Sequence, residues 1–325
     1  MGINNVTFLH YCYIYTSICT TSMKNNSLKL QWISTFFCLC TFSNCSVPQN
    51  NPSPEAILQQ RHKEIYAMCD SLVKKNHACG DSLKTHKTKQ DSIRVYAEIA
   101  HLNKAIVQSR DNELQLDFEF IRNNPSSKMS IDLIYYRVVN REYTNSYDTF
   151  FHYYNLLSND LKSSEMGETL NIEFINWKNS LVGSYAKDFS LNDADDKQIT
   201  LSSYRNKSYV LLDFWGVHCG PCRHGMPYLK ELYSKYHNKG LEIIGISPDY
   251  DLDNWRQAIK QDGTNIWRQV SERQNKAEIF KEFYAKAMPV KILINKQGLI
   301  VGRWYGGGIK DDADLAKKLE IAFGM

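Results

Sequence analysis

The chain has 325 residues, of which 43% are apolar and 23% are charged, a composition that is ordinary for a globular protein and leaves room for two domains. It contains no long block of like charge, so nothing in it predicts binding to nucleic acid. The formal net charge is +4, and Lys24 and Lys29 are the only charged residues before residue 45, so the remainder carries +2 and the charge indicates no class of partner.

The first 44 residues have the pattern of an export signal. Residues 1–22 contain no Lys or Arg, whereas Met23 begins a basic segment that runs to Lys29 and precedes the mostly apolar segment 30–42. We therefore expect residues 1–44 to be a leader, within which Met23 is the true start of translation. The apolar segment is interrupted by polar residues and is too short for a good membrane span.

Directly after the leader comes a cysteine at a position typical of lipid attachment. The run from Phe42 to Cys45 resembles the lipoprotein box of bacteria, with Asn44 in place of the usual small residue. This predicts lipid attachment at Cys45, followed by a polar tether over residues 45–54, and simple signal cleavage nearby is the alternative. The expected location is the bacterial cell envelope or periplasm, with a lipid anchor in the membrane.

Residues 55–181 predict a mostly α-helical domain. From residue 55 to residue 124 there is no proline and one glycine, Gly80, and apolar residues recur at helical spacing. This pattern predicts a helical hairpin that turns near Gly80. One stretch disagrees, because apolar and polar residues alternate over 114–120 as they do in a strand.

Helical patterns resume after a turn at residues 123–127. They cover three segments: 131–139, 150–157 and 170–181. The many aromatic residues here are expected in the core. No activating motif lies near Cys69 or Cys79, so we expect both to be structural.

From Val182 the pattern changes to short apolar strands that alternate with helices, which predicts an α/β domain over residues 182–325. The expected strands are 209–215, 241–247, 290–295 and 299–304, the last two joined as a hairpin. The expected helices run from the cysteine pair described next to about His237, over 255–260 and over 311–323.

Two cysteines, Cys219 and Cys222, lie at the junction of a predicted strand and a predicted helix. Cysteines three apart lie on one face of a helix and can close a small disulfide ring. Free backbone N–H groups and the helix dipole in the first turn favour a thiolate on the first cysteine. Cys219 is therefore the predicted nucleophile, and Cys222 the resolving thiol, of a dithiol/disulfide exchange site.

A pair with this spacing also occurs in zinc sites and in structural disulfides. No second pair of cysteines or histidines lies at the distance that would complete a zinc site. His218 and His224 flank the cysteines, which leaves open a copper-handling protein with these side chains as soft ligands. For the exchange site we expect no bound metal and no cofactor.

Six successive features of residues 182–325 form a known pattern. They are the opening run 182–189 with Lys187 where proline is usual, the strand and turn 199–204, the central strand 209–215, the Cys219-Gly220-Pro221-Cys222 motif, the helix start 223–227 and the loop 287–289. In these features the segment resembles the thioredoxin fold, and more closely the TlpA/ResA-like thiol–disulfide oxidoreductases of bacterial envelopes. The resemblance covers under half of the chain and implies an α/β thioredoxin-like fold after the helical domain.

The resemblance implies roles for further residues. Pro289 corresponds to the cis-proline of the fold, which places the backbone of Met288 beside the disulfide, where an extended substrate can hydrogen-bond. Asp213 corresponds to a buried carboxylate that helps to deprotonate the resolving thiol, and burial should raise its pKa. Trp215 is expected to shield the disulfide and contribute to substrate binding, with core packing as the equal alternative.

The same resemblance implies the function. The protein is expected to reduce disulfides of envelope proteins, and a membrane thiol-electron donor would return it to the dithiol form. The Gly220-Pro221 dipeptide resembles that of reducing thioredoxins. A disulfide oxidase or isomerase would use the same residues and stays open, because His218 and Gly225 replace the usual aromatic and glutamate residues and leave the potential undetermined.

Overall fold

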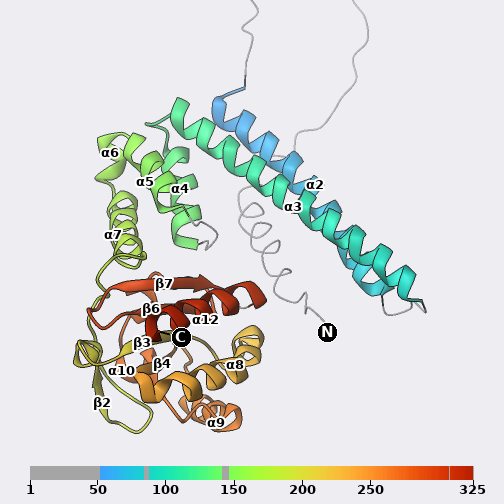
Figure 1. Cartoon of the computed structure of the whole chain (residues 1–325). Helices are drawn as coiled ribbons and strands as arrows, with labels where there is room; N and C mark the ends of the chain where they lie inside the picture. The colour runs from blue at the N-terminus through green and yellow to red at the C-terminus, as the bar shows by residue number, and fades with distance from the viewer. Residues whose placement is uncertain (1–51, 84–87, 141–145, 307, 325) are drawn as a thin grey trace, which may run out of the picture. The chain divides into compact units, whose positions relative to one another are not determined.

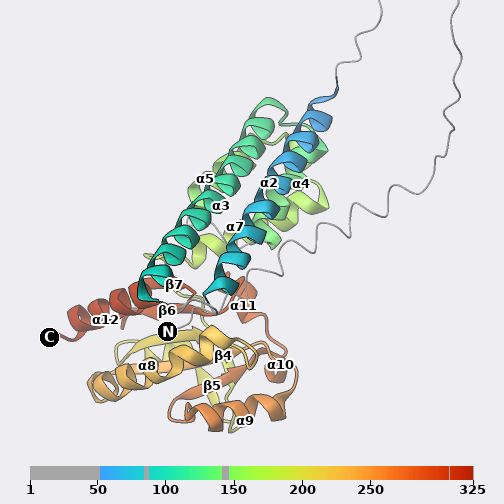
Figure 2. The same cartoon turned by 90° about the vertical axis from the view of Figure 1, so that its right-hand side faces the viewer.

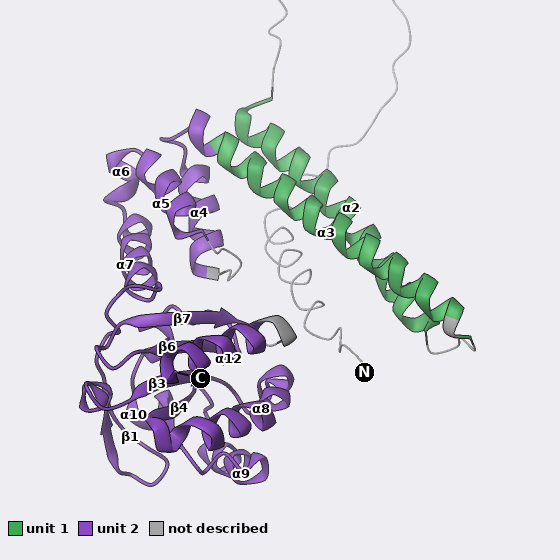
Figure 3. Ribbon diagram, in the orientation of Figure 1, with its two compact units in different colours: residues 1–120 green, residues 121–325 purple. Residues whose placement is uncertain are grey.

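A computed structural model of the protein describes residues 52–83, 88–140, 146–306 and 308–324. The chain forms two compact units, residues 1–120 and residues 121–325 (Figure 3). The predicted leader, its start at Met23 and the predicted lipid site Cys45 lie outside the described residues. Within the described ranges, no helix combines the length and the apolarity that a membrane span requires.

The first unit is built on a helical hairpin of α2 (Pro54–Ser82) and α3 (Lys89–Asn123), which lie side by side in both views (Figures 1 and 2). Ser53 caps α2 by accepting a hydrogen bond from the backbone N–H of Ala56, and Pro54 occupies the first turn, where no N–H is needed. The hairpin is confirmed, although α2 continues through Gly80 and ends at Ser82.

The alternating stretch 114–120 is helical and belongs to α3. The buried face of this helix carries two carboxylates one turn apart, Glu113 and Asp117, which face α2. The hydroxyl of Tyr66 donates to Glu113 Oε1 at 3.0 Å, and His62 Nε2 lies 2.7 Å from Asp117 Oδ1. Polar residues thus occupy buried helical positions where the apolar pattern expects leucine or valine, which is why the pattern looked strand-like.

The second unit begins with four helices. They are α4 (Lys128–Asn140), α5 (Tyr147–Leu156), α6 (Asn159–Lys162) and α7 (Glu165–Asn179). These helices confirm the three predicted segments and add α6. Their aromatic side chains pack together as expected, with the rings of Tyr154 and Phe174 5.1 Å apart between centroids.

After these helices, the second unit continues with a five-stranded mixed sheet that is flanked by helices (Figure 1). In spatial order its strands are β5 (Arg268–Ser271), β4 (Leu241–Ser247), β3 (Tyr209–Phe214), β6 (Val290–Ile294) and β7 (Ile300–Tyr305). The central strand β3 is parallel to β4 and antiparallel to β6. A small hairpin of β1 (Ser190–Asn192) and β2 (Gln198–Thr200) precedes the sheet.

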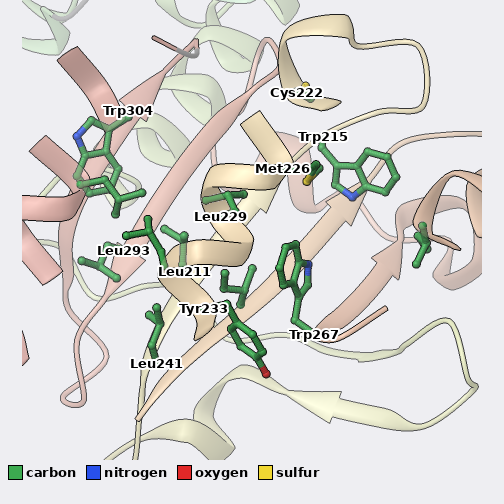
Figure 4. Close-up of a cluster of buried hydrophobic side chains, with 14 of the residues drawn as sticks. Leu211, Trp215, Cys222, Met226, Leu229, Tyr233, Leu241, Trp267, Leu293 and Trp304 are labelled. Atoms are coloured by element: carbon green, nitrogen blue, oxygen red, sulfur yellow. The ribbon is translucent and has the colours of Figure 1, made fainter. Parts of the chain in front are cut away.

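Alternating side chains of the strands supply two hydrophobic cores, one on each face of the sheet. Leu211 of β3 belongs to the core shared with α8 (Gly220–Tyr236), α9 (Leu252–Asp262) and α12 (Ile309–Phe323) (Figure 4). Its neighbour Leu212 points to the opposite core, together with the β1–β2 hairpin and α11 (Ile279–Glu282). This layered arrangement confirms the predicted α/β fold.

Candidate active site

Cys219 and Cys222 are joined by a disulfide, with their Cα atoms 5.3 Å apart, where β3 gives way to α8. Cys219 is the N-cap of α8, and its Sγ accepts a hydrogen bond from the backbone N–H of Cys222 at 3.2 Å. Pro221 lies in the first turn of the helix, where its missing N–H leaves no carbonyl without a partner. The first cysteine therefore lies at the positive end of a helix of seventeen residues, as the spacing predicted.

The two sulfur-bearing residues differ in exposure. Cys219 is half-buried, whereas Cys222 is 3% exposed. Figure 4 shows Cys222 close to Trp215 and Met226 at one end of the hydrophobic core that contains all three. An incoming disulfide can therefore reach Cys219 more readily than Cys222.

The flanking histidines, His218 and His224, are both exposed. In the described part of the chain, no group of three or more His, Cys, Asp or Glu side chains is arranged to hold a metal ion.

Asp213 is buried in the middle of the sheet and is 2% exposed. It lies opposite Lys291 in the β3–β6 pair, and its Oδ1 is 3.7 Å from Lys291 Nζ. Burial raises the pKa of the Asp213 carboxyl above its usual range, and the nearby Lys291 ammonium opposes that rise. Alternation along β3 directs Asp213 to the same face as Leu211 and Trp215, which is the face that also holds Cys222.

The peptide bond between Met288 and Pro289 is cis, as the resemblance implied. The Pro289 carbonyl accepts a hydrogen bond from the backbone N–H of Gly306 at 2.7 Å. Met288 is 36% exposed, and its Sδ and Cε lie 3.2 Å from the position that a Cβ on Gly216 would occupy. The cis-proline loop thus packs against the segment that leads into Cys219.

Trp215 is fully buried, and its indole Nε1 donates to Gln269 Oε1 at 3.0 Å. Gln269 lies in β5 and also donates through Nε2 to the carbonyl of Thr264 at 3.3 Å. The ring has no exposed surface for a direct contact with substrate, so its contribution to the site is made by packing. Gln269 orients this ring, and nothing in the sequence had singled it out.

Asp249 supports the loop before Cys219. Its Oδ2 accepts hydrogen bonds from the backbone N–H of Val217 at 2.9 Å and from the hydroxyl of Ser247 at 2.7 Å. An open pocket of about 280 Å³ lies alongside, and its lining consists of Val217, His218, Pro248, Asp249, Tyr250, Asp251 and Asn254. The pocket adjoins the more exposed of the two active-site cysteines.

The C-terminal part of the second unit is similar in sequence to known proteins. Residues 181–319 match the Redoxin family. Over 133 residues, 41% of this chain and 75% of the relative, the chain is 32% identical to the thiol-disulfide oxidoreductase ResA of Bacillus thuringiensis subsp. konkukian. It is 31% identical to the ResA protein of Bacillus anthracis over 153 residues, which cover 47% of this chain and 86% of that protein.

Solved structures with similarity to the chain include two from Bacteroides. A thiol-disulfide oxidoreductase from Bacteroides fragilis is 31% identical, with coverage of 42% of this chain and 99% of that chain and a TM-score of 0.37. The thioredoxin domain of a thiol-disulfide oxidoreductase from Bacteroides vulgatus is 29% identical, with coverage of 43% and 97% and a TM-score of 0.39. From the sequence matches to the ResA proteins and to the Redoxin family, we conclude that this chain belongs to the ResA family of thiol–disulfide oxidoreductases.

Proposed function

We propose that this protein reduces disulfide bonds of other proteins in the bacterial cell envelope, with Cys219 as the nucleophile and Cys222 as the resolving thiol. The observation that carries the proposal is the difference in exposure across one disulfide. Cys219 is partly accessible at the N-terminus of α8, whereas Cys222 is enclosed in the core behind it. Such a pair admits a partner to the first sulfur and keeps the second for the intramolecular step.

The reaction proceeds by two thiol–disulfide exchanges. The Cys219 thiolate attacks one sulfur of the substrate disulfide, so that a mixed disulfide forms and the other substrate sulfur leaves as a thiolate. The Cys222 thiolate then attacks Cys219 Sγ and releases the second substrate thiol. Two electrons pass to the substrate, and the protein is left with the Cys219–Cys222 disulfide.

Three further groups assist these steps in our proposal. Asp213 accepts the proton of the Cys222 thiol, because its raised pKa makes it a stronger base than an ordinary aspartate. The backbone of Met288, held before the cis bond to Pro289, hydrogen-bonds an extended substrate chain. Trp215 encloses the disulfide from the side of the core and so keeps the buried sulfur away from solvent.

The location and the organisation of the chain are also proposals. The pattern of residues 1–44 supports an export signal that starts at Met23, with lipid attachment at Cys45. We further propose a tether over residues 45–54, a helical domain over 55–181 and a thioredoxin-like domain over 182–325. In an oxidising compartment the dithiol has to be restored by a dedicated donor, for which a membrane thiol carrier is the proposed source.

A trapping experiment tests the proposed function. The full chain with Cys222→Ala, expressed with its leader, should accumulate mixed disulfides through Cys219, because the resolving thiol is missing. Thiol-blocked extracts separated without and then with reductant would reveal the partners. The Cys219→Ala variant and the double variant are the matched controls and should trap far less. Equal trapping by Cys219→Ala and Cys222→Ala, or none by either, would contradict the assigned roles.

A further inference from the structure

The loop that leads into the cis-proline, residues 284–288, is held by contacts with the helices that precede the sheet. The ring of Tyr284 stacks on that of Trp177 in α7, with centroids 4.7 Å apart and planes 8° from parallel. The Tyr284 hydroxyl donates to the carbonyl of Val138 in α4 at 2.8 Å. Both rings are buried, so one side chain joins the loop to two helices.

The backbone at Tyr284 is itself held in an unusual conformation. Its φ is +48°, in the left-handed region that residues other than glycine seldom adopt. Arg303 of β7 donates through Nη2 to the Tyr284 carbonyl at 2.8 Å and through Nη1 to the carbonyl of Ser180, the C-cap of α7, at 3.4 Å. The same guanidinium therefore links the end of α7 to the start of the loop.

An ion pair makes a second link two residues along the loop. Lys286 Nζ lies 2.5 Å from Glu173 Oε2 of α7, and the two side chains are only 17% and 6% exposed. The Lys286 ammonium also lies 5.0 Å from the centroid of the Tyr284 ring. Removing one partner of such an enclosed pair leaves the other charge without compensation, so the pair constrains the position of the loop strongly.

We propose that α7 fixes the position of the cis-proline loop, and that Glu173, Trp177, Tyr284 and Lys286 are positioning residues for substrate binding. The inference rests on the proposed function, in which the Met288 backbone binds the extended chain around a substrate disulfide. Lys286 precedes Met288 by two residues, so a shift at the ion pair displaces the backbone that meets the substrate. The helices therefore affect how well a polypeptide substrate binds, and they leave the intrinsic reactivity of the Cys219 and Cys222 sulfurs unchanged.

The test compares two disulfides in single-turnover reactions with the reduced full-length protein. Insulin presents a disulfide within a polypeptide, whereas hydroxyethyl disulfide has no backbone to bind. Glu173→Gln should slow the reaction with insulin about tenfold, the loss expected when one well-placed binding contact is displaced. The rate with hydroxyethyl disulfide should stay within about twofold of the wild type.

Four further variants make the result specific to the pair. Lys286→Met should behave like Glu173→Gln, and the double variant should be no slower with insulin than either single variant, because it contains no unpaired charge. Glu320→Gln, in the exposed pair of Glu320 with Lys235, removes one carboxylate away from the loop and should change neither rate. Leu319→Ala, a buried change in α12, controls for a general loss of stability.

The outcomes separate the inference from the function on which it rests. Glu173→Gln with an unchanged insulin rate, or with equal losses for both disulfides, would overturn the positioning role while the wild type still reduces insulin. A wild-type protein that reduces neither disulfide would overturn the proposed function, and the positioning role with it.

Discussion

Asp213 and Lys291 face each other across β3 and β6, with Asp213 Oδ1 3.7 Å from Lys291 Nζ and both side chains buried. Burial raises the pKa of Asp213 more than the nearby ammonium lowers it. A carboxylate with a raised pKa is a stronger base than an ordinary aspartate, so it is better suited to accept a proton from a buried thiol. The pair therefore places on the central strand the carboxylate that we propose as the base for the resolving thiol.

Asp213→Asn should slow resolution of the mixed disulfide by about a hundredfold, the lower end of what a positioned general base contributes. The wild-type rate should rise with pH as Asp213 ionises, and this rise should be missing from the variant. Quenched-flow decay of a preformed mixed disulfide, followed over a pH series, measures both effects. Identical pH profiles for the two proteins would remove Asp213 from the mechanism.

Asp213 should also make the folding stability of the protein depend on pH. Because its pKa is raised in the folded protein, the folded state keeps this proton at pH values where an unfolded chain, with an aspartate pKa of about 3.9, has released it. The contribution of Asp213 to the unfolding free energy is therefore complete below about pH 3.9, and it is lost as the pH rises through the pKa of Asp213 in the folded protein. The unfolding free energy of Asp213→Asn should therefore increase relative to wild type across this interval and then level off. Denaturant titrations at several pH values test this, and a difference that does not vary with pH would contradict it.

Gly216→Ala should disturb the contact between the cis-proline loop and the segment before Cys219. The new Cβ would lie 3.2 Å from Sδ and Cε of Met288, a flexible side chain that can move aside. We expect a stability loss below about 1 kcal/mol and an insulin reduction rate about fivefold lower. Gly225→Ala is the matched control, because a Cβ there meets nothing within 4 Å. Equal insulin rates for the two variants would show that the Met288 position does not matter.

Gln269→Leu should destabilise the protein by about 1–3 kcal/mol, because the buried indole N–H of Trp215 loses its acceptor. Gly245 leaves the room for this glutamine, since a Cβ on Gly245 would lie 2.1 Å from Gln269 Oε1. Urea unfolding followed by tryptophan fluorescence measures the loss. A change under about 0.5 kcal/mol would mean that the indole finds another partner.

In the reduced protein, Cys219 should react with iodoacetamide at least about tenfold faster than Cys222, because the helix N-terminus favours its thiolate and the core encloses the other sulfur. Peptide mapping by mass spectrometry after timed quenching gives the rate at each cysteine separately. Faster labelling of Cys222 would reverse the assigned roles.

The sequence predicted the bounds of strands best where the strand is apolar along its whole length. Residues 241–247 form β4 with the predicted bounds, because a strand covered on both faces is a continuous apolar run. By contrast, β5 was not predicted, since Val270 is the one strongly apolar residue among its four. This strand nevertheless supplies Gln269, whose burial depends on neighbours in the sheet that spacing along the chain does not reveal.

The contacts that hold the cis-proline loop could not be predicted from the sequence either. Trp177 and Tyr284 are more than a hundred residues apart, and their stacking follows from tertiary packing alone. The left-handed backbone at Tyr284 has no signal in residue type, because such positions usually hold glycine or asparagine. The cysteine pair, in contrast, was predicted together with its place at the start of a helix, because that motif depends on local spacing.

The reduction potential of the Cys219–Cys222 pair tests the central claim most directly. The protein from Ser46 onward would be equilibrated with dithiothreitol buffers of known ratio, and the fraction of dithiol read by thiol trapping. A reductase fed by a dedicated donor predicts a value near that of thioredoxin, about −270 mV. A value near about −120 mV would contradict the account and identify a protein that inserts disulfides.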